Sequence, residues 1–316
     1  RRDVAAWLVS PENPLVARVA VNRIWQHFFG TGLVATAENF GTQGERPSHP
    51  ELLDHLAVSF RAGGWDTKKL IKRIVLTQAY RRSSVSTPES RRIDPANRLH
   101  PQAPRLRLPA ELIRDQALAS SGLLVRTVGG PSVKTYQPAG LWEEMSFKGD
   151  FSAQYYVQDH GDKLWRRSLY TFWKRTVPPP SLQTFDAPER EFCIVRRSPT
   201  NTPLQALVTL NDPTFVEAAR QLASVSIAEA KGVPEAIALR IYRRVLGRLP
   251  SRREQSALLS LANREYSEYR RNPKRASDLL GIGEFPADRR QDPVLLGAWT
   301  SVALAVLNLD EALNRG

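Results

Sequence analysis

PEAIALRIYRRVLGRLPSRRE, at residues 234–254, contains the clearest helical pattern in the chain. Pro234 suits the first turn of a helix and Gly247 suits its end, because proline needs no backbone N–H partner there and glycine adopts a positive φ freely. Ser251 and Glu254 have the spacing of a capping box, which predicts that a second helix begins there. The apolar residues of the first helix recur at helical spacing: Ile237, Leu239, Ile241, Tyr242, Val245 and Leu246. The stretch therefore predicts two consecutive helices joined by a short turn.

Similar patterns lie on both sides of this stretch. Asp212–Pro213 and Asp292–Pro293 each combine a capping side chain with a proline suited to the first helical position. Towards the N-terminus, helices are predicted to begin near Asn13–Pro14, Ser48 with Glu51 as a capping box, Asp66–Thr67 and Pro109. Residues 83–97 carry turn and charged residues and are expected to form an exposed loop. The chain is therefore predicted to be mainly α, a multi-helical globular bundle.

The helical pattern fails in the centre of the chain. Glycine, proline, tyrosine and glutamine dominate residues 129–161, which predicts an irregular region. SLYTFW, at residues 168–173, is rich in aromatic and β-favouring residues and predicts a strand. We therefore expect an N-terminal helical region (1–125), an irregular Gly/Pro/aromatic-rich insertion with short strand segments and one strand pair (126–200), and a C-terminal helical region (201–316). All three are expected to form one compact unit.

The composition is strongly basic and almost free of cysteine. The chain has 45 Lys and Arg against 32 Asp and Glu, a formal net charge of +13, and one cysteine. One cysteine excludes an internal disulfide and cysteine-based zinc or iron–sulfur sites. No apolar run reaches the ~18–20 residues of a membrane span. The chain begins at Arg1 in a helical pattern without a starting methionine, so we expect it to be a fragment of a longer protein.

A basic chain can bind nucleic acid, anionic polysaccharide or anionic lipid. The alternative is that the arginines lie on solvent-exposed faces of helices and bind no ligand. Most arginines occur in scattered pairs, and no nucleic-acid-binding motif accompanies them. Nucleic acid is therefore not favoured as a partner, whereas an anionic glycan or an acidic protein remains open.

The histidines do not have the spacing of a metal site. No HExxH pair is present, and His49 and His55 fall on different faces of one helix. A CxxCH haem-attachment motif is also absent. We therefore predict no metal ion and no cofactor in this segment.

One loop gathers several chemically active residue types. Asp186, Cys193, Arg196 and Arg197 lie within FDAPEREFCIVRR, at residues 185–197. Neighbouring arginines favour a thiolate at Cys193, but the flanking Phe192, Ile194 and Val195 favour a buried thiol, which is our prediction. The acidic residues suit either internal ion pairs or acid–base chemistry. Arg166 and Arg167 form a further pair that can bind anions.

Aromatic residues are concentrated in the irregular central region. They are Trp142, Phe147, Phe151, Tyr155 and Tyr156. Aromatic side chains on a loop can stack on sugars or bases, or can fasten the loop to the protein body. We favour the second interpretation.

Four strings together resemble a known family. They are NRIWQHFFGTGLV (22–34), ENFGTQGERPSHPELLDHLA (38–57), RRSLYTFWKRTVPPP (166–180) and FDAPEREFCIVRRSPTNTPLQALVTLNDPTFVEAAR (185–220). The chain is similar to the planctomycete-type domain of unknown function 1553, also called planctomycete-specific domain one. The resemblance implies a C-terminal position in an exported protein, behind a planctomycete-type cytochrome c domain. It implies an extracytoplasmic location and an upstream haem, and it assigns no catalytic residue.

Two functional hypotheses follow. The first is a non-catalytic interaction or scaffold module beside a c-type cytochrome domain, linked to polysaccharide breakdown or electron transfer, whose basic surface meets an acidic partner or anionic glycan. The second is a hydrolase or redox-coupled enzyme with a site between residues 41–49 and residues 186–197. Asp186, His49 and Cys193 would be its catalytic candidates, and Arg196 and Arg197 its anion clamp. The convergence of these residues on one cleft is the observation that separates the two.

Overall fold

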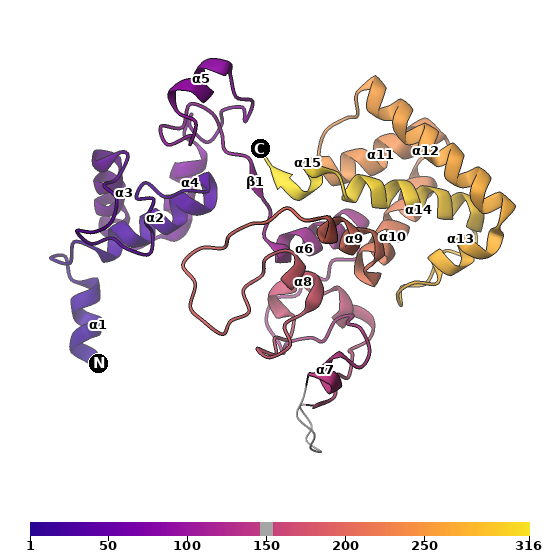
Figure 1. Ribbon diagram of the computed structural model, residues 1–316, viewed down its shortest axis with the longest axis horizontal. Coiled ribbons are helices and arrows are strands. Elements are labelled where there is room, and N and C mark those ends of the chain that lie inside the picture. The colour runs from indigo at the N-terminus through magenta and orange to yellow at the C-terminus, as the bar shows by residue number, and fades with distance from the viewer. Residues whose placement is uncertain (146–153) are drawn as a thin grey trace. The chain divides into compact units, whose positions relative to one another are not determined.

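A computed structural model describes residues 1–145 and 154–316 and confirms the mainly helical fold (Figure 1). The chain forms two compact units, one of residues 1–106 with 315–316, and one of residues 107–314. The helix that follows Pro109 lies in the second unit, and the division at residues 125 and 200 stays a prediction. Within the described ranges the only sheet pairs two short strands, β1 (Leu106–Arg107) and β2 (Asn314–Arg315).

The first unit is helical, and its two longest helices pack against each other. Its helices are α1 (Arg2–Val9), α2 (Val16–Phe29), α3 (Pro50–Ala62), α4 (Thr67–Val75) and α5 (Pro88–Ile93). Trp25 and Phe29 of α2 stack at 4.2 Å between ring centroids and are buried in the core of this unit. Gly30 ends α2 with φ +76°, as the sequence predicts. The buried side-chain amide of Asn22 donates to the carbonyl of Val34 and accepts from the N–H of Val34. These two hydrogen bonds hold the turn that follows α2 against that helix.

The second unit is larger and contains the main core. Its helices are α6 (Ala110–Ser121), α7 (Leu141–Glu144), the 3-10 helices η2 (Gly161–Trp165) and η3 (Ser168–Tyr170), α8 (Pro180–Thr184), α9 (Pro203–Asn211), α10 (Pro213–Glu229), α11 (Pro234–Leu246), α12 (Arg252–Arg271), α13 (Pro273–Leu280), α14 (Pro293–Leu307) and α15 (Asp310–Leu313). Helix α10 packs against α14, α6 and α11. The apolar residues of these helices form one continuous core, because α10 and α14 are buried on most of their surface.

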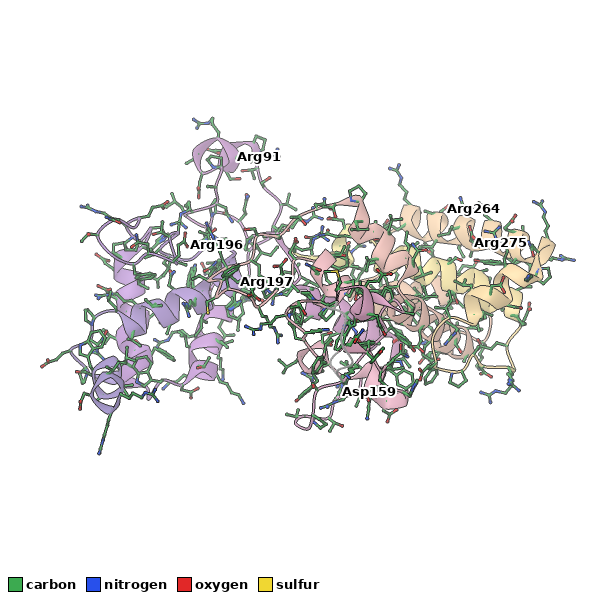
Figure 2. The ribbon with its side chains drawn as sticks, turned by 60° about the horizontal axis from the view of Figure 1, so that its bottom comes forward. Arg91, Asp159, Arg196, Arg197, Arg264 and Arg275 are labelled. Carbon is green, nitrogen blue, oxygen red and sulfur yellow. The ribbon has the colours of Figure 1, made fainter. Side chains whose placement is uncertain are left out.

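The two helices predicted to begin at Pro234 and after Ser251 are confirmed as α11 and α12. Gly247 ends α11 with φ +73°, and both hydrogen bonds of the Ser251–Glu254 capping box are present. Charged side chains cover the outer face of α12 and α13. Arg264 and Arg275, labelled in Figure 2, form ion pairs of 3.2 and 2.6 Å with Glu265 and Glu268.

Two predicted helix boundaries and one predicted loop are wrong in detail. Helix α3 begins after His49 rather than after Ser48, because Pro50 takes the first helical position and Ser48 instead donates to the carbonyl of Leu33 at 3.4 Å. Helix α2 begins at Val16, although Asn13 still accepts from two backbone N–H groups ahead of it. The predicted loop at residues 83–97 contains α5, whose capping box joins Thr87 and Ser90.

The predicted strand at residues 168–173 is also wrong. Residues 168–170 form η3, and only an isolated parallel bridge links Thr171 to Val133. The buried guanidinium of Arg114 on α6 explains the difference, because it donates to the carbonyl of Arg166 at 2.9 Å and to the hydroxyl of Ser168 at 3.2 Å. These tertiary hydrogen bonds outweigh the local preference for a strand.

No helix in residues 1–145 and 154–316 has the length and hydropathy that crossing a bilayer requires.

Candidate functional site

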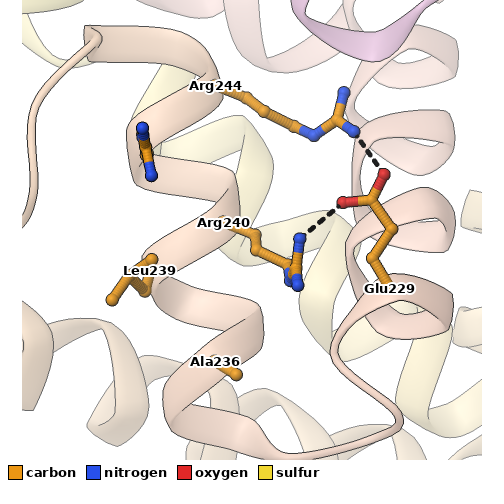
Figure 3. A pocket seen from close by; sticks show the side chains of 6 residues that line it. Glu229, Ala236, Leu239, Arg240 and Arg244 are labelled. Atoms are coloured by element: carbon orange, nitrogen blue, oxygen red, sulfur yellow. Dashed lines mark hydrogen bonds and ion pairs between the residues drawn. The ribbon is translucent and has the colours of Figure 1, made fainter.

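An open pocket lies between the end of α10 and one face of α11 (Figure 3). Its cavity volume is about 500 Å³. The residues that line it are Glu229, Ala236, Leu239, Arg240, Arg243 and Arg244. We refer to these six residues as the arginine pocket.

The helical repeat of α11 brings the three arginines together. Arg240, Arg243 and Arg244 have the i, i+3 and i+4 spacing of neighbours on a helix surface. The opposite face of α11 is buried in the core through Ile237 and Ile241. The apolar half of the helix therefore fixes the orientation of its basic half.

One carboxylate bridges two of the arginines. Glu229, the last residue of α10, accepts from Arg240 at 2.8 Å through one oxygen and from Arg244 at 2.6 Å through the other, as Figure 3 shows. The three side chains are 34–41% exposed. Partly exposed ion pairs of this kind contribute at most about 1 kcal/mol each, so these pairs can exchange with other anions.

The pocket keeps an excess of positive charge. Three arginines and one glutamate leave a net charge of +2. Arg243 is exposed and forms no ion pair with any residue that the structure describes. Each guanidinium has five N–H donors, so Arg240 and Arg244 also retain donors beyond those that Glu229 accepts. Ala236 and Leu239 give the pocket an apolar floor beside these donors.

Asp186 has a structural partner within its own loop. Its carboxylate accepts from the backbone N–H of Thr200 at 2.7 Å and from the hydroxyl of Thr200 at 2.8 Å. Asp186 also adopts φ +62°, a conformation that few residues other than glycine adopt. These contacts close the base of the loop at residues 186–200.

Arg197 is paired with a carboxylate of α6. Its guanidinium donates to both carboxylate oxygens of Glu111, at 2.7 and 2.8 Å. Burial raises the pKa of Glu111, but the hydrogen bonds from Arg197, a backbone hydrogen bond and the charges of Arg197 and Arg190 together outweigh burial and hold that pKa below its ordinary value. Arg196 is exposed on the same loop. The structure thus gives Arg197 an internal partner.

Cys193 is exposed, so the prediction of a buried thiol is wrong. The apolar neighbours that suggested burial are themselves exposed, and Phe192 is 80% exposed. A short apolar run therefore does not ensure burial when the loop that carries it leaves the core.

The arginine pair 166–167 is divided between the core and the surface. Arg166 is buried, donates to the carbonyls of Pro131 and Gly129, and lies 3.9 Å from the ring centroid of Tyr170. Arg167 is exposed. Arg166 therefore holds the chain at residues 129–131.

His49 belongs to the first unit, where it lies beside a buried histidine. Its ring is stacked with that of His100 at 6.2 Å between centroids, and its Nδ1 is 3.0 Å from the hydroxyl of Ser48. Residues 41–49 are in the first unit and residues 186–197 in the second. The convergence of these two segments stays a prediction.

Aromatic residues of the central region form a cluster around Trp142. Trp142 is buried, with ring centroids 5.0 Å from Tyr156 and 5.8 Å from Phe172. The ammonium groups of Lys134 and Lys174 lie over the Trp142 ring at 5.6 and 4.3 Å. Trp142 and Tyr156 therefore pack against other residues of the same region, and the fastening of that region to the protein body stays a prediction. Tyr155 is exposed, and the predictions for Phe147 and Phe151 fall outside the described residues.

The described part of the chain contains no group of three or more His, Cys, Asp or Glu side chains placed to hold a metal ion.

The arginine pocket was not identified from the sequence. Arg243 and Arg244 stand out only as one of several arginine pairs, and Glu229 lies in a different helix. The available pattern was Arg240, Arg243 and Arg244 on the face opposite the apolar residues of α11. Such a row predicts a basic surface but does not identify the carboxylate that faces it.

The comparisons with known proteins give a family but no activity. The model of one family, described as PSD1, protein of unknown function (DUF1553), matches residues 1–262. No curated protein and no solved structure matches the chain. Since the match covers more than half of the sequence, the chain belongs to the PSD1 family of proteins of unknown function (DUF1553).

Proposed function

We propose that this chain is a non-catalytic interaction module that binds an acidic segment of a protein partner in the arginine pocket. The observation that carries the proposal is the arrangement of three arginines and one glutamate around an apolar floor. Positive charge steers an acidic segment towards the pocket, and bidentate guanidinium contacts then orient its carboxylates.

The floor of the pocket favours a protein ligand over a glycan. Ala236 and Leu239 present small aliphatic surfaces, and among the described residues no aromatic ring lines the pocket. Sugar-binding sites commonly use aromatic rings as stacking surfaces, whereas an amphipathic peptide places aliphatic side chains in an apolar groove. The combination of aliphatic floor and basic rim thus suits a segment with alternating acidic and aliphatic residues.

The sequence resemblance suggests where the partner is found. Companion domains of the same longer protein, among them a c-type cytochrome domain, are the natural source of such a segment. In this proposal the chain itself carries no cofactor, the haem belongs to the upstream domain, and the protein acts outside the cytoplasm in polysaccharide breakdown or electron transfer. The module would help to hold the cytochrome domain in a stable assembly.

The enzyme hypothesis has less support. The carboxylate of Asp186 is hydrogen-bonded to Thr200, and Arg197 is paired with Glu111. The acid–base candidate and one of the two anion-binding arginines therefore already have partners within the chain. A carboxylate held by backbone and hydroxyl donors and a bidentate ion pair are ordinary means of fixing a loop.

The test is a binding titration with a synthetic peptide in which Glu and Leu alternate at helical spacing, labelled with fluorescein and followed by anisotropy. The pocket variant carries Arg240→Gln, Arg243→Gln and Arg244→Gln. The control variant carries Arg252→Gln, Arg253→Gln and Arg271→Gln, three exposed arginines of α12 outside the pocket. Both variants lose the same charge, so a difference between their affinities for the peptide measures the contribution of the pocket arginines alone.

We expect the pocket variant to lose affinity by about tenfold or more and the control variant by less than about threefold, at low salt. Raising the salt concentration should weaken binding to the wild-type chain. Equal losses in both variants, or an absence of peptide binding, would contradict the proposal. Binding of a sulfated glycan fragment to the pocket without binding of the peptide would replace the protein partner with a glycan.

A further inference from the structure

We infer that Glu229 determines the ligand class of the arginine pocket, acting as a built-in competitor that restricts the pocket to segments with several carboxylates. The inference rests on the proposed function, since it concerns the same pocket. It assigns a specificity role to a residue that does not itself attract an acidic ligand.

The geometry of Glu229 matches that of an incoming carboxylate. Its two oxygens contact Arg240 and Arg244 separately, at 2.8 and 2.6 Å, and thus span residues one helical turn apart. A single external carboxylate would replace these contacts with equivalent ones and gain nothing further.

Covalent attachment favours Glu229 over any single external carboxylate. A group held in the same chain competes at an effective concentration on the order of millimolar or more. A ligand with one acidic side chain must overcome that advantage through its own ion pairs, which are weak at an exposed site. Glu229 therefore excludes such ligands.

A ligand with several acidic side chains is not excluded in the same way. It can contact Arg243, which has no ion pair within the described part of the chain, and then displace Glu229 from Arg240 and Arg244. Its contacts reinforce one another because they belong to one molecule. The pocket should therefore select segments that present at least two carboxylates within one helical turn.

The position of Glu229 in its helix supports this role. Glu229 is the last residue of α10, where the helix macrodipole disfavours a negative charge. Its side chain is also 38% exposed, so it can turn to solvent when it is displaced. A carboxylate at this position is therefore explained by its ion pairs with the arginines and not by a contribution to the stability of α10.

The test compares Glu229→Gln with Glu235→Gln in the whole chain. Glu235 is exposed in the first turn of α11 and does not line the pocket, so both variants gain the same charge and only one loses the competitor. Two labelled peptides serve as probes, one with a single Glu among neutral residues and one with four Glu at helical spacing. Anisotropy gives the affinity of each.

We expect Glu229→Gln to bind the single-Glu peptide at least about threefold more tightly than the wild type, with a smaller relative gain for the four-Glu peptide. Glu235→Gln should match the wild type with both. Suppose that the wild type binds the four-Glu peptide and that Glu229→Gln binds each peptide no more tightly than the wild type does. Glu229 would then order the arginines rather than compete for them. The inference would be wrong, while the proposed function would stand. If neither peptide binds to any of the chains, the proposed function itself fails.

Discussion

The indole Nε1 of Trp165 donates a 2.7 Å hydrogen bond to the carboxylate of Glu217, a side chain with no solvent exposure. The same carboxylate accepts from the backbone N–H of Phe285 at 2.6 Å and from the hydroxyl of Tyr136 at 3.2 Å. Burial and the neighbouring Glu217 raise the pKa of Tyr136, which keeps the phenol protonated as a donor. One buried charge on α10 thus fastens three segments that carry little regular structure of their own.

Replacing Trp165 with Phe should destabilise the second unit by about 2 kcal/mol, because a hydrogen bond to a buried charged group is lost while an aromatic ring is kept. Urea unfolding followed by circular dichroism measures the change. Trp173→Phe is the matched control, since the Nε1 of Trp173 donates to the backbone carbonyl of Glu189 at an exposed site. Equal stability losses in the two variants would show that ring size, rather than the bond to Glu217, determines the effect.

The pair of Arg197 and Glu111 predicts a stability difference that depends on pH. Arg197→Gln should lower the free energy of unfolding by about 1 kcal/mol at neutral pH. Because the folded-state pKa of Glu111 lies below 4.5, the contribution of the pair is complete above pH 4.5 and is lost as the pH falls through the folded-state pKa. The difference between variant and wild type should therefore shrink below pH 4.5.

Arg175→Gln is the control for this experiment, because Arg175 is exposed and the substitution removes the same charge. Urea titrations at pH 7 and at successively lower pH compare the three chains. A deficit for Arg197→Gln that stays constant down to the acid limit of the titration would mean that Glu111 does not contribute through its charge.

Most of the helical architecture could be predicted because its determinants are local. Asp212 and Asp292 cap the helices that follow them, and Ser251 with Glu254 forms the expected capping box. Each of these contacts joins residues a few positions apart, so the sequence alone contains the information. The start of α3 was predicted one residue early, at Ser48, because the Ser48–Glu51 spacing fits a capping box whereas Pro50 takes the first helical position after His49.

The errors arise where distant residues decide the local structure. Residues 168–173 have β-favouring side chains, but Arg114 of α6 binds the backbone at Arg166 and the hydroxyl of Ser168. The arginine pocket was missed for the same reason, because Glu229 and Arg240 come from different helices. A sequence shows which charges are present but not which opposite charge each one meets.

His100 should remain uncharged well below neutral pH. Burial, with smaller contributions from His49 and Arg98, lowers the pKa of His100 to about 4. Between pH 6.5 and about 4 the unfolded state therefore binds a proton that the folded state does not, so the stability of the first unit should fall as the pH falls through this interval. NMR titration of the imidazole resonances measures the midpoint directly.

His100→Phe identifies the resonance of His100 by its disappearance, and the aromatic ring is retained beside Phe29, whose centroid lies 4.7 Å from that of His100. The variant should also lose the pH dependence of stability described above. His55→Gln, at an exposed position of α3, should keep it. A titration midpoint for His100 at or above 6.5 would mean that its ring is open to water.

The most direct test of the central claim is hydrogen–deuterium exchange of the whole chain with and without the four-Glu peptide. Residues 229–246, which span the end of α10 and all of α11, should gain protection, and Arg240→Gln, Arg243→Gln and Arg244→Gln together should abolish that gain. Protection at residues 41–49 and 186–197 with none at residues 229–246 would contradict the account and favour a site between those two segments.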